Sequence, residues 1–320
     1  MQTKLDALKA ELLGRFEVRK TVKQKAAFAQ WACDYAAQLG YRTDTERSGK
    51  LVDTRNIVFG DLSKARTLIT AHYDTCARLP FPNFMTPQCW PVIILTQLLL
   101  PVILFLAIGF CVGFGARMLV NMLGVSKGAG LLATLLIGYA ALGGIIWLML
   151  FGPANPHTAN DNTSGVAAVL LLLHAFVGRE DVAFVLFDNE EKGLLGASAF
   201  VKARPALQKR TFVVNLDCIS DGDTLLYAGS KAGMKSDAAK RILKALEEIA
   251  PGYGKRTEHG ASPGTLYPSD QMVFKRGTAF AALKGRRILY LDRIHTAKDI
   301  VFEDDNLLCI AEAIKAGLQP

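Results

Sequence analysis

The sequence predicts an α/β fold: a mostly parallel central sheet with helices on both faces, interrupted by a two-helix hairpin. Three observations predict it. Strand-like and helical segments alternate along most of the chain. The expected strands are apolar on both faces, as is typical of parallel strands covered by helices. Between residues 79 and 160 the only charged side chains are Arg117 and Lys127, so an apolar insert separates two parts of ordinary composition.

The individual elements follow from hydrophobic periodicity. Helices are expected where apolar residues recur at three- and four-residue spacing, and strands where short apolar runs end in polar turns. The helices are expected over residues 5–16, 22–39, 164–176, 194–203, 236–249 and 304–318. The strands are expected over residues 56–59, 66–71, 182–187, 211–216, 223–228 (an edge strand), 280–283 and 288–291.

The bulk composition limits the kinds of partner. The chain has 320 residues, 51% of them apolar, and a net charge of +8. A basic balance suits an anionic membrane surface. We expect no nucleic-acid partner, because no basic run is interleaved with aromatic residues. Six cysteines form no CxxC pair, which is unlike a disulfide framework and favours a reducing compartment.

The apolar insert contains two charge-free stretches, residues 91–116 and 129–151. Each exceeds the roughly 20 residues that cross a hydrocarbon core of ~30 Å, so we expect two transmembrane helices. A buried hairpin in a soluble domain is the alternative, but two such helices rarely fit inside a domain of this size. Gly109 and Gly113 would allow close helix packing, and such small residues permit a homo-oligomer.

A hairpin that crosses a membrane twice leaves both of its flanks on the same side. We therefore expect residues 1–78 and 153–320 to form a single domain, with the hairpin inserted at residues 79–152. The basic residues of the short loop between the spans favour a cytoplasmic loop. The charged segment before the first span has no export signal, and long domains follow the charge rule poorly. We expect an integral membrane protein with two spans and a cytoplasmic domain.

Acidic and histidine residues lie at the ends of the expected strands or in the turns that follow them. In a parallel sheet the carboxyl ends of the strands converge on one rim, where ligands bind. Imidazole and carboxylate groups together suit Zn²⁺, with Co²⁺ and Mn²⁺ as alternatives. The residues concerned are His72, Asp74, Asp161, Glu190, Glu191, Asp217 and His295.

The same residues divide into two candidate metal sites. Two cations ~3.5–4 Å apart need a shared anionic ligand, and Asp161, at a turn before a helix, is the best candidate. His72 and Asp217 would complete one site, and Glu191 and His295 the other. This is the chemistry of a two-metal hydrolase.

The remaining candidates have supporting roles. Glu190 would face the attacking water as the general base. Asp74 would orient the imidazole of His72 through a hydrogen bond. Tyr267 would donate a hydrogen bond to a developing oxyanion, although a loop tyrosine without a catalytic role is an equal alternative. Asp188 and His174 are expected to be structural and Cys76 to contribute only packing. His157 and His259, both in expected loops, are left open.

These residues make the chain resemble the M28 zinc aminopeptidases, which are co-catalytic di-zinc exopeptidases. The resemblance covers nearly all of the chain outside residues 79–152. It implies two Zn²⁺ ions, a zinc-exopeptidase type of sheet, a peptide substrate, and the ligand and base assignments given above. The matching segments are AHYDT (71–75), NDNTSG (160–165), DNEEKGLLGA (188–197), NLD (215–217), SDQMVF (269–274) and IHTAKD (294–299).

The sequence departs from the family pattern at one expected substrate position. Gln271 stands where the family commonly has histidine, so the resemblance leaves the substrate contact at this position open. No acidic residue that would hold a free α-amine is identifiable.

The expected function is a membrane-anchored di-zinc aminopeptidase that removes N-terminal residues from short apolar or membrane-associated peptides. Two alternatives remain: a glutaminyl-cyclase-like acyltransferase that uses a single zinc, and a non-catalytic membrane receptor or scaffold on the same fold. The complete two-metal ligand set argues against both.

Overall fold

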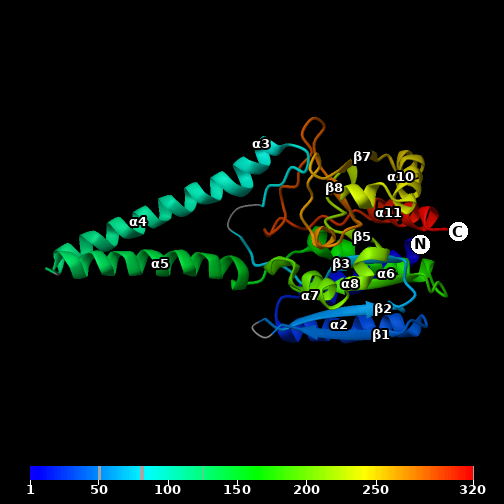
Figure 1. Ribbon diagram of the computed structural model, residues 1–320, viewed down its shortest axis with the longest axis horizontal. Helices are drawn as coiled ribbons and strands as arrows, with labels where there is room; N and C mark the ends of the chain where they lie inside the picture. The colour runs from blue at the N-terminus through cyan, green and yellow to red at the C-terminus, as the bar shows by residue number, and fades with distance from the viewer. Residues whose placement is uncertain (50–51, 80–82, 125, 320) are drawn as a thin grey trace.

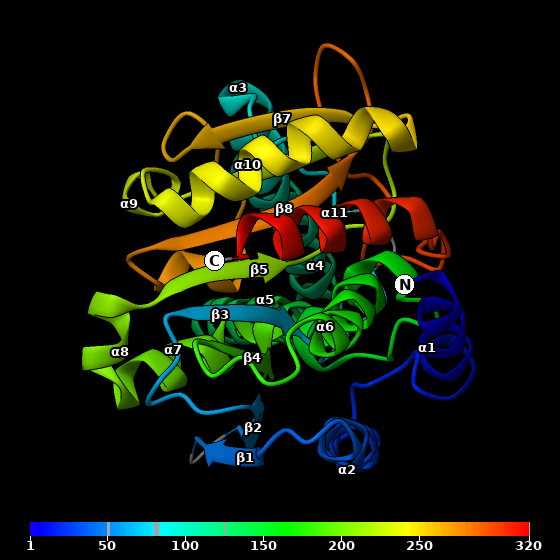
Figure 2. The same ribbon diagram turned by 90° about the vertical axis from the view of Figure 1, so that its right-hand side faces the viewer.

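The computed structural model describes residues 1–49, 52–79, 83–124 and 126–319. At its centre is an eight-stranded sheet in the order β1-β2-β4-β3-β5-β8-β6-β7, which runs from β1 at the bottom to β7 at the top of Figure 2. The strands are β1 (Thr43–Ser48), β2 (Thr54–Phe59), β3 (Thr67–His72), β4 (Val182–Phe187), β5 (Phe212–Leu216), β6 (Thr224–Gly229), β7 (Arg256–Ala261) and β8 (Gly277–Leu283).

The helical elements connect these strands and form the hairpin. The α-helices are α1 (Gln2–Arg15), α2 (Val22–Gln38), α3 (Trp90–Ile93), α4 (Leu100–Met122), α5 (Lys127–Phe151), α6 (Gly165–Ala175), α7 (Leu195–Ala203), α8 (Pro205–Arg210), α9 (Lys231–Met234), α10 (Asp237–Ile249) and α11 (Asp304–Gly317). Two π-helical turns, η1 (Ile94–Leu99) and η2 (Ala159–Ser164), and three 3₁₀ turns, η3 (Glu190–Lys192), η4 (Ala250–Tyr253) and η5 (Asp270–Val273), complete the set.

The sheet is mixed: four of its seven strand pairs are parallel, among them β6 with β7, and three are antiparallel. The four central strands β4, β3, β5 and β8 run parallel to one another. Antiparallel pairs flank them: β2 with β4 and β1 with β2 on one side, and β6 with β8 on the other. The expected parallel arrangement therefore holds for the centre, where the carboxyl ends of β3, β4 and β5 share one rim.

The strand predictions were wrong at the borders of the sheet. Residues 223–228 correspond to β6, which is internal because β7 pairs with its outer side. Both edge strands, β1 (TDTERS) and β7 (RTEHGA), are too polar to show an apolar run, as is common for strands that face solvent at an edge. Residues 288–291 form only isolated bridges, from Tyr290 to Lys284 and from Leu291 to Met85.

Two hydrophobic layers cover the sheet, and β4 contributes to both. Its side chains Phe184 and Leu186 pack under α1, α2, α6, α10 and α11. Val185 and Phe187 pack on the opposite face with α7 and α8. The alternation follows from the two-residue period of a strand, and it confirms that helices cover both faces.

The hairpin projects away from the sheet (Figure 1). Its first arm runs from Trp90 to Met122 through α3, η1 and α4, and its second arm is α5. The two arms pack against each other, and the most apolar stretch of each has none of its residues buried. Strands β1–β3 precede the hairpin and β4–β8 follow it, so both flanks build one sheet. By length and composition, both arms are able to cross a membrane.

Candidate active site

The carboxyl ends of three central strands bring the predicted ligands to one pocket of about 160 Å³. His72 ends β3, Asp217 follows β5, and the two glutamates open the turn after β4. The other two ligands come from η2, before α6, and from the loop after β8. The predicted residues in the lining are His72, Asp161, Glu190, Glu191, Asp217, Tyr267 and His295.

Asp161 lies between two imidazoles. Its Oδ1 is 3.3 Å from Nε2 of His72, and its Oδ2 is 3.1 Å from Nε2 of His295. Each carboxylate oxygen thus faces a different histidine, as expected of a group shared by two cations. On the far sides, Nε2 of His72 is 3.5 Å from Asp217 Oδ1, and Nε2 of His295 is 3.2 Å from Glu191 Oε2.

The donor atoms of this cluster fit metal cations. Among the described residues, Glu191 Oε1 and Asp217 Oδ1 are buried without a hydrogen-bond partner. Such carboxylate oxygens are costly to bury unless a cation neutralises them. Three sets of side chains have potential ligand atoms within 4.8 Å of one another: His72 with Asp161 and Asp217, Cys76 with Glu191 and His295, and His72 with Glu190 and Glu191.

Burial and the neighbouring ionisable groups shift the pKa of the carboxylates in the pocket. Burial raises the pKa of Glu190 well above its usual value; His72 opposes this and Glu191 adds to it. Burial also pushes the pKa of Asp161 upward, but hydrogen bonds with His295 and His72 outweigh it and leave that pKa below its usual value. Burial lowers the pKa of His72 and of His295, but the neighbouring carboxylates outweigh it and raise both well above the usual value. Carboxylates gathered in this way favour bound cations.

Asp74 positions the site through two different groups. Nδ1 of His72 lies 3.1 Å from the main-chain oxygen of Asp74, whereas the Asp74 carboxylate is 3.6 Å away. That carboxylate instead accepts the N–H groups of Glu190 and Glu191, at 3.0 and 3.4 Å. The carbonyl therefore makes the imidazole contact that we expected of the carboxylate, and the carboxylate holds the glutamate turn.

Several residues at or next to the candidate ligands have a left-handed backbone conformation. Asn189 (φ 55°), Cys218 (φ 53°) and His295 (φ 63°) have positive φ without being glycine. The first precedes Glu190 and the second follows Asp217. Non-glycine residues pay for this conformation, and such residues cluster at functional sites. The backbone is therefore bent sharply at the points from which the ligands project.

Asp188 supports the same turn from behind, consistent with the expected structural role. Its Oδ1 is 2.7 Å from Nζ of Lys25 in a buried ion pair, and its Oδ2 accepts the N–H of Arg55 at 2.9 Å. Nζ of Lys25 also donates to Asn189 Oδ1 at 3.0 Å. The left-handed residue before Glu190 is thus anchored to α2.

Two aspartates next to the site were not assigned roles from the sequence. Asp299 accepts the N–H groups of Asn160 and Asp161, at 2.8 and 3.0 Å, and so fixes the loop that carries Asp161. Its position four residues after His295, in IHTAKD, was the available signal. Asp270 is fully buried, and neither carboxylate oxygen has a partner among the described residues. Its charge contributes to the raised pKa of Glu190.

Of the two residues expected to contact substrate, Tyr267 lines the catalytic pocket and Gln271 does not. Tyr267 lines the pocket, but its hydroxyl donates to the main-chain oxygen of Asp217 at 3.1 Å. Gln271 belongs to a neighbouring hollow. Its amide nitrogen donates to the Tyr267 carbonyl, and its amide oxygen accepts from Asn215 at 3.3 Å. In this structure Gln271 supports the turn of Tyr267 from behind.

Cys76 lies closer to the chemistry than packing alone requires, because it groups with Glu191 and His295. Burial raises the pKa of its thiol well above the usual value, and Glu191 adds to the effect, which favours the neutral thiol. The other histidines lie elsewhere. His174 lies between Lys4 Nζ (2.9 Å) and Tyr35 Oη (2.7 Å), His157 contacts Glu17 (3.1 Å), and His259, on β7, contacts Glu247 (3.9 Å).

The fold and the residue cluster define the class of protein as an α/β protein with a candidate metal site at the carboxyl ends of its central strands. Residues 147–314, just over half of the chain, match the model of peptidase family M28. The chain therefore belongs to peptidase family M28. The matched range includes Asp161, Glu190, Glu191, Asp217 and His295. Enzymes of this family are zinc-dependent, and the cluster supplies candidate ligands for such an ion.

Solved structures show the same fold at low sequence identity. The glutaminyl cyclase of Porphyromonas gingivalis is 15% identical, with a TM-score of 0.61 over 99% of this chain and 97% of that one. A Zn-dependent exopeptidase of Parabacteroides distasonis is 13% identical, with a TM-score of 0.60 over 98% and 96%. The LapA aminopeptidase of Legionella pneumophila is 12% identical, with a TM-score of 0.58 over 99% and 68%. No curated protein sequence matches the chain.

Proposed function

We propose that this chain is a membrane-anchored di-zinc aminopeptidase that acts on short apolar or membrane-associated peptides. Residues 1–78 and 153–320 form its cytoplasmic catalytic domain, and residues 79–152 anchor it with two spans. The observation that carries the proposal is the placement of Asp161, with one carboxylate oxygen toward each of the imidazoles of His72 and His295.

The ligands divide between two ions. His72, Asp161 and Asp217 would hold one Zn²⁺, and Asp161, Glu191 and His295 would hold the other. Ions bound there would supply Lewis acidity, which acidifies water and polarises a carbonyl group. The buried, unpaired oxygens of Asp217 and Glu191 support this division, because each belongs to a different half of the cluster.

Glu190 is the general base. Its carboxylate accepts the proton of the attacking water and returns it to the leaving amine. The main-chain N–H of Glu190 is held by Asp74, so the turn is fixed while the side chain remains in the pocket lining. Burial raises its pKa, His72 opposes this, and the like charges of Glu191 and Asp270 add to it. The raised pKa favours proton uptake.

The hairpin contributes directly to the catalytic pocket. Gln97, in the π-helical turn η1 of the first arm, lines the pocket together with Asn83. Its Nε2 donates to Asn83 Oδ1 at 3.1 Å and to the Phe84 carbonyl at 2.6 Å. The N–H of Asn83 in turn donates to the carbonyl of Ile294, next to His295. An apolar membrane arm thus forms part of the pocket wall, which supports substrates that arrive along the bilayer surface.

The function is tested by metal analysis of the purified full chain in detergent, combined with product analysis. We expect two zinc ions per chain and release of free N-terminal amino acids from peptides. Incubation with a peptide that begins with glutamine distinguishes the alternative, because cyclisation would change the product mass by loss of ammonia. Ammonia loss with one bound zinc would establish the cyclase, and absence of both metal and turnover would favour a receptor or scaffold.

Gln97 tests the link between the membrane arm and the pocket. In Gln97→Ala we expect KM to rise about 2- to 10-fold, since one net hydrogen bond is worth roughly 0.5–1.5 kcal/mol. The measurement uses chain in liposomes, with a lipid-partitioning peptide and its hydrophilic analogue. Leu95→Ala is the matched control, because the Leu95 side chain is 52% exposed on the same helical turn. Equal rates on the two peptides by the unmodified chain would contradict delivery from the membrane.

A further inference from the structure

A second and larger pocket lies at the other end of the parallel strands. Its floor is formed by the amino ends of β3, β4 and β5, through Thr67, Val182 and Phe212. Its volume is about 840 Å³, against about 160 Å³ for the catalytic pocket. Leu318 and Gln319 line it, and the C-terminus lies at the end of the molecule opposite the hairpin (Figure 1). This pocket therefore faces away from the membrane anchor.

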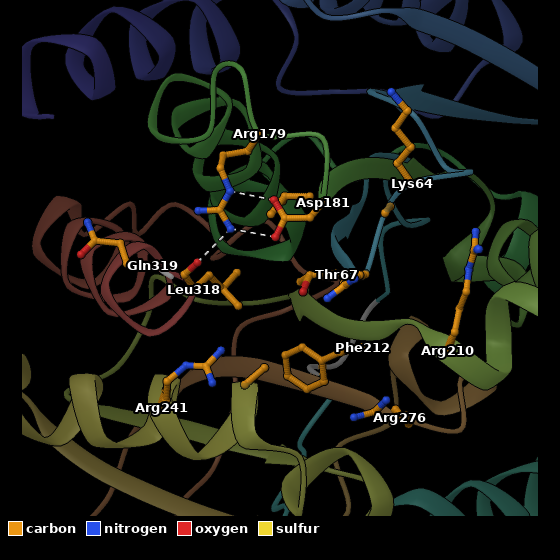
Figure 3. Close-up of a pocket in the computed structure, with 14 residues that line it drawn as sticks. Lys64, Thr67, Arg179, Asp181, Arg210, Phe212, Arg241, Arg276, Leu318 and Gln319 are labelled. Atoms are coloured by element: carbon orange, nitrogen blue, oxygen red, sulfur yellow. Dashed lines mark hydrogen bonds and ion pairs between the residues drawn. The ribbon is translucent and has the colours of Figure 1, made fainter.

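Six of the fourteen lining residues are cationic, and Asp181 is the one carboxylate among the described lining residues. The cations come from separate parts of the chain: the loop before β3, the loop before β4, the end of α8, the middle of α10 and the loop before β8. Figure 3 shows several of them around Phe212 and Thr67. They are Lys64, Arg66, Arg179, Arg210, Arg241 and Arg276.

Two of the six cations are neutralised by the protein. Arg179 makes a two-pronged pair with Asp181, at 2.7 and 2.8 Å, and Lys64 pairs with Glu180 at 2.7 Å. Figure 3 shows the Arg179 pair and its third bond, to the Leu318 carbonyl. Both carboxylate oxygens of Asp181 therefore accept hydrogen bonds from Arg179.

The other four cations have no carboxylate within ion-pair distance in the described part of the chain. Two of them are oriented by main-chain oxygens: Arg210 donates to Leu62 and Ser63 at 3.0 and 2.8 Å, and Arg241 donates to Gly317 at 2.9 Å. Arg66 and Arg276 have no side-chain hydrogen bond among the described residues. Carbonyl groups hold a guanidinium in place without cancelling its charge, so a positive field remains around the hollow.

We propose that this pocket binds a small polyphosphorylated molecule. Guanidinium groups present paired N–H donors that match phosphate oxygens, and several of them around one hollow suit an anion with more than one phosphate. The volume falls in the range of about 300–1,000 Å³ that is typical of small-molecule sites. Phe212, the aromatic residue of the lining, is 3% exposed, so the pocket offers no stacking platform of the kind that single-stranded nucleic acid uses.

Binding of sodium tripolyphosphate to the purified full chain, measured by isothermal titration calorimetry, tests the proposal. The titration is done in about 0.15 M NaCl, where the Debye length is about 8 Å and attraction between distant exposed charges is screened. We expect saturable binding by the unmodified chain and at least about tenfold weaker binding by Arg66→Gln/Arg276→Gln, because two charge-assisted contacts are lost. Arg286→Gln/Arg287→Gln removes the same charge from exposed positions and is expected to bind as the unmodified chain does.

The outcomes that overturn the proposal are distinct. They are absence of saturable binding, equal weakening in both double variants, or tighter binding of a single-stranded oligonucleotide or of vesicles that contain phosphatidylinositol bisphosphate. If the pocket double variant fails to fold, Arg241→Gln replaces it and is expected to weaken binding about threefold or more. Binding is read without peptide turnover, so this test is independent of the proposed peptidase function.

Discussion

Replacing Glu190 by glutamine is expected to lower peptide turnover by about 100- to 10,000-fold, the usual contribution of a general base. That loss corresponds to about 3–5 kcal/mol of barrier. Glutamine keeps the size of the side chain but has no carboxylate to accept the proton. Because both proposed ion sites are complete without Glu190, we expect the metal content to stay unchanged.

Metal content and turnover must be measured on the same preparation. Glu190 also groups with His72 and Glu191 as a potential ligand, so loss of an ion in Glu190→Gln would make it a ligand rather than the base. Glu248→Gln is the matched control, since the Glu248 side chain is 67% exposed on α10. Turnover within about twofold of the unmodified enzyme in Glu190→Gln would refute the assignment.

Replacing Asp161 by asparagine is expected to remove both ions and to abolish turnover. The substitution removes a negative charge whose two oxygens lie 3.3 and 3.1 Å from Nε2 of His72 and of His295. Two cations at ~3.5–4 Å repel unless such a charge lies between them. The loss of metal affinity should exceed the roughly 10- to 100-fold change that follows removal of an outer hydrogen-bond partner. Metal content after dialysis and peptide hydrolysis measure the effect.

Asp237→Asn is the control for this substitution, because the Asp237 side chain is 88% exposed. If the variant keeps one ion per chain, Asp161 is a ligand only of the ion that was lost. That outcome would contradict the proposal that both ions share Asp161. A variant that keeps two ions and full turnover would remove Asp161 from the metal site altogether.

Much of the site followed from local sequence patterns. His72, Glu191 and Asp217 each end or follow an apolar run, and the carboxyl ends of parallel strands converge. The central strands and most helices were predicted for the same reason, since periodicity is a local property. The polar edge strands β1 and β7 were missed because they carry no apolar run. Residues 288–291 do carry an apolar run, but they form only isolated bridges and no strand.

The sequence by itself determined which residues are candidates for the chemistry and which segments are apolar enough to cross a membrane, because both depend on residue type and on spacing along the chain. Only the tertiary structure decided that the Asp74 carboxylate holds the glutamate turn, that Asp299 fixes the Asp161 loop, and that Gln97 of the hairpin reaches the pocket. It also gathered the arginines of the second pocket from separate segments. These contacts join residues far apart in sequence, and no periodicity records them, because they arise from the packing of strands and loops in space.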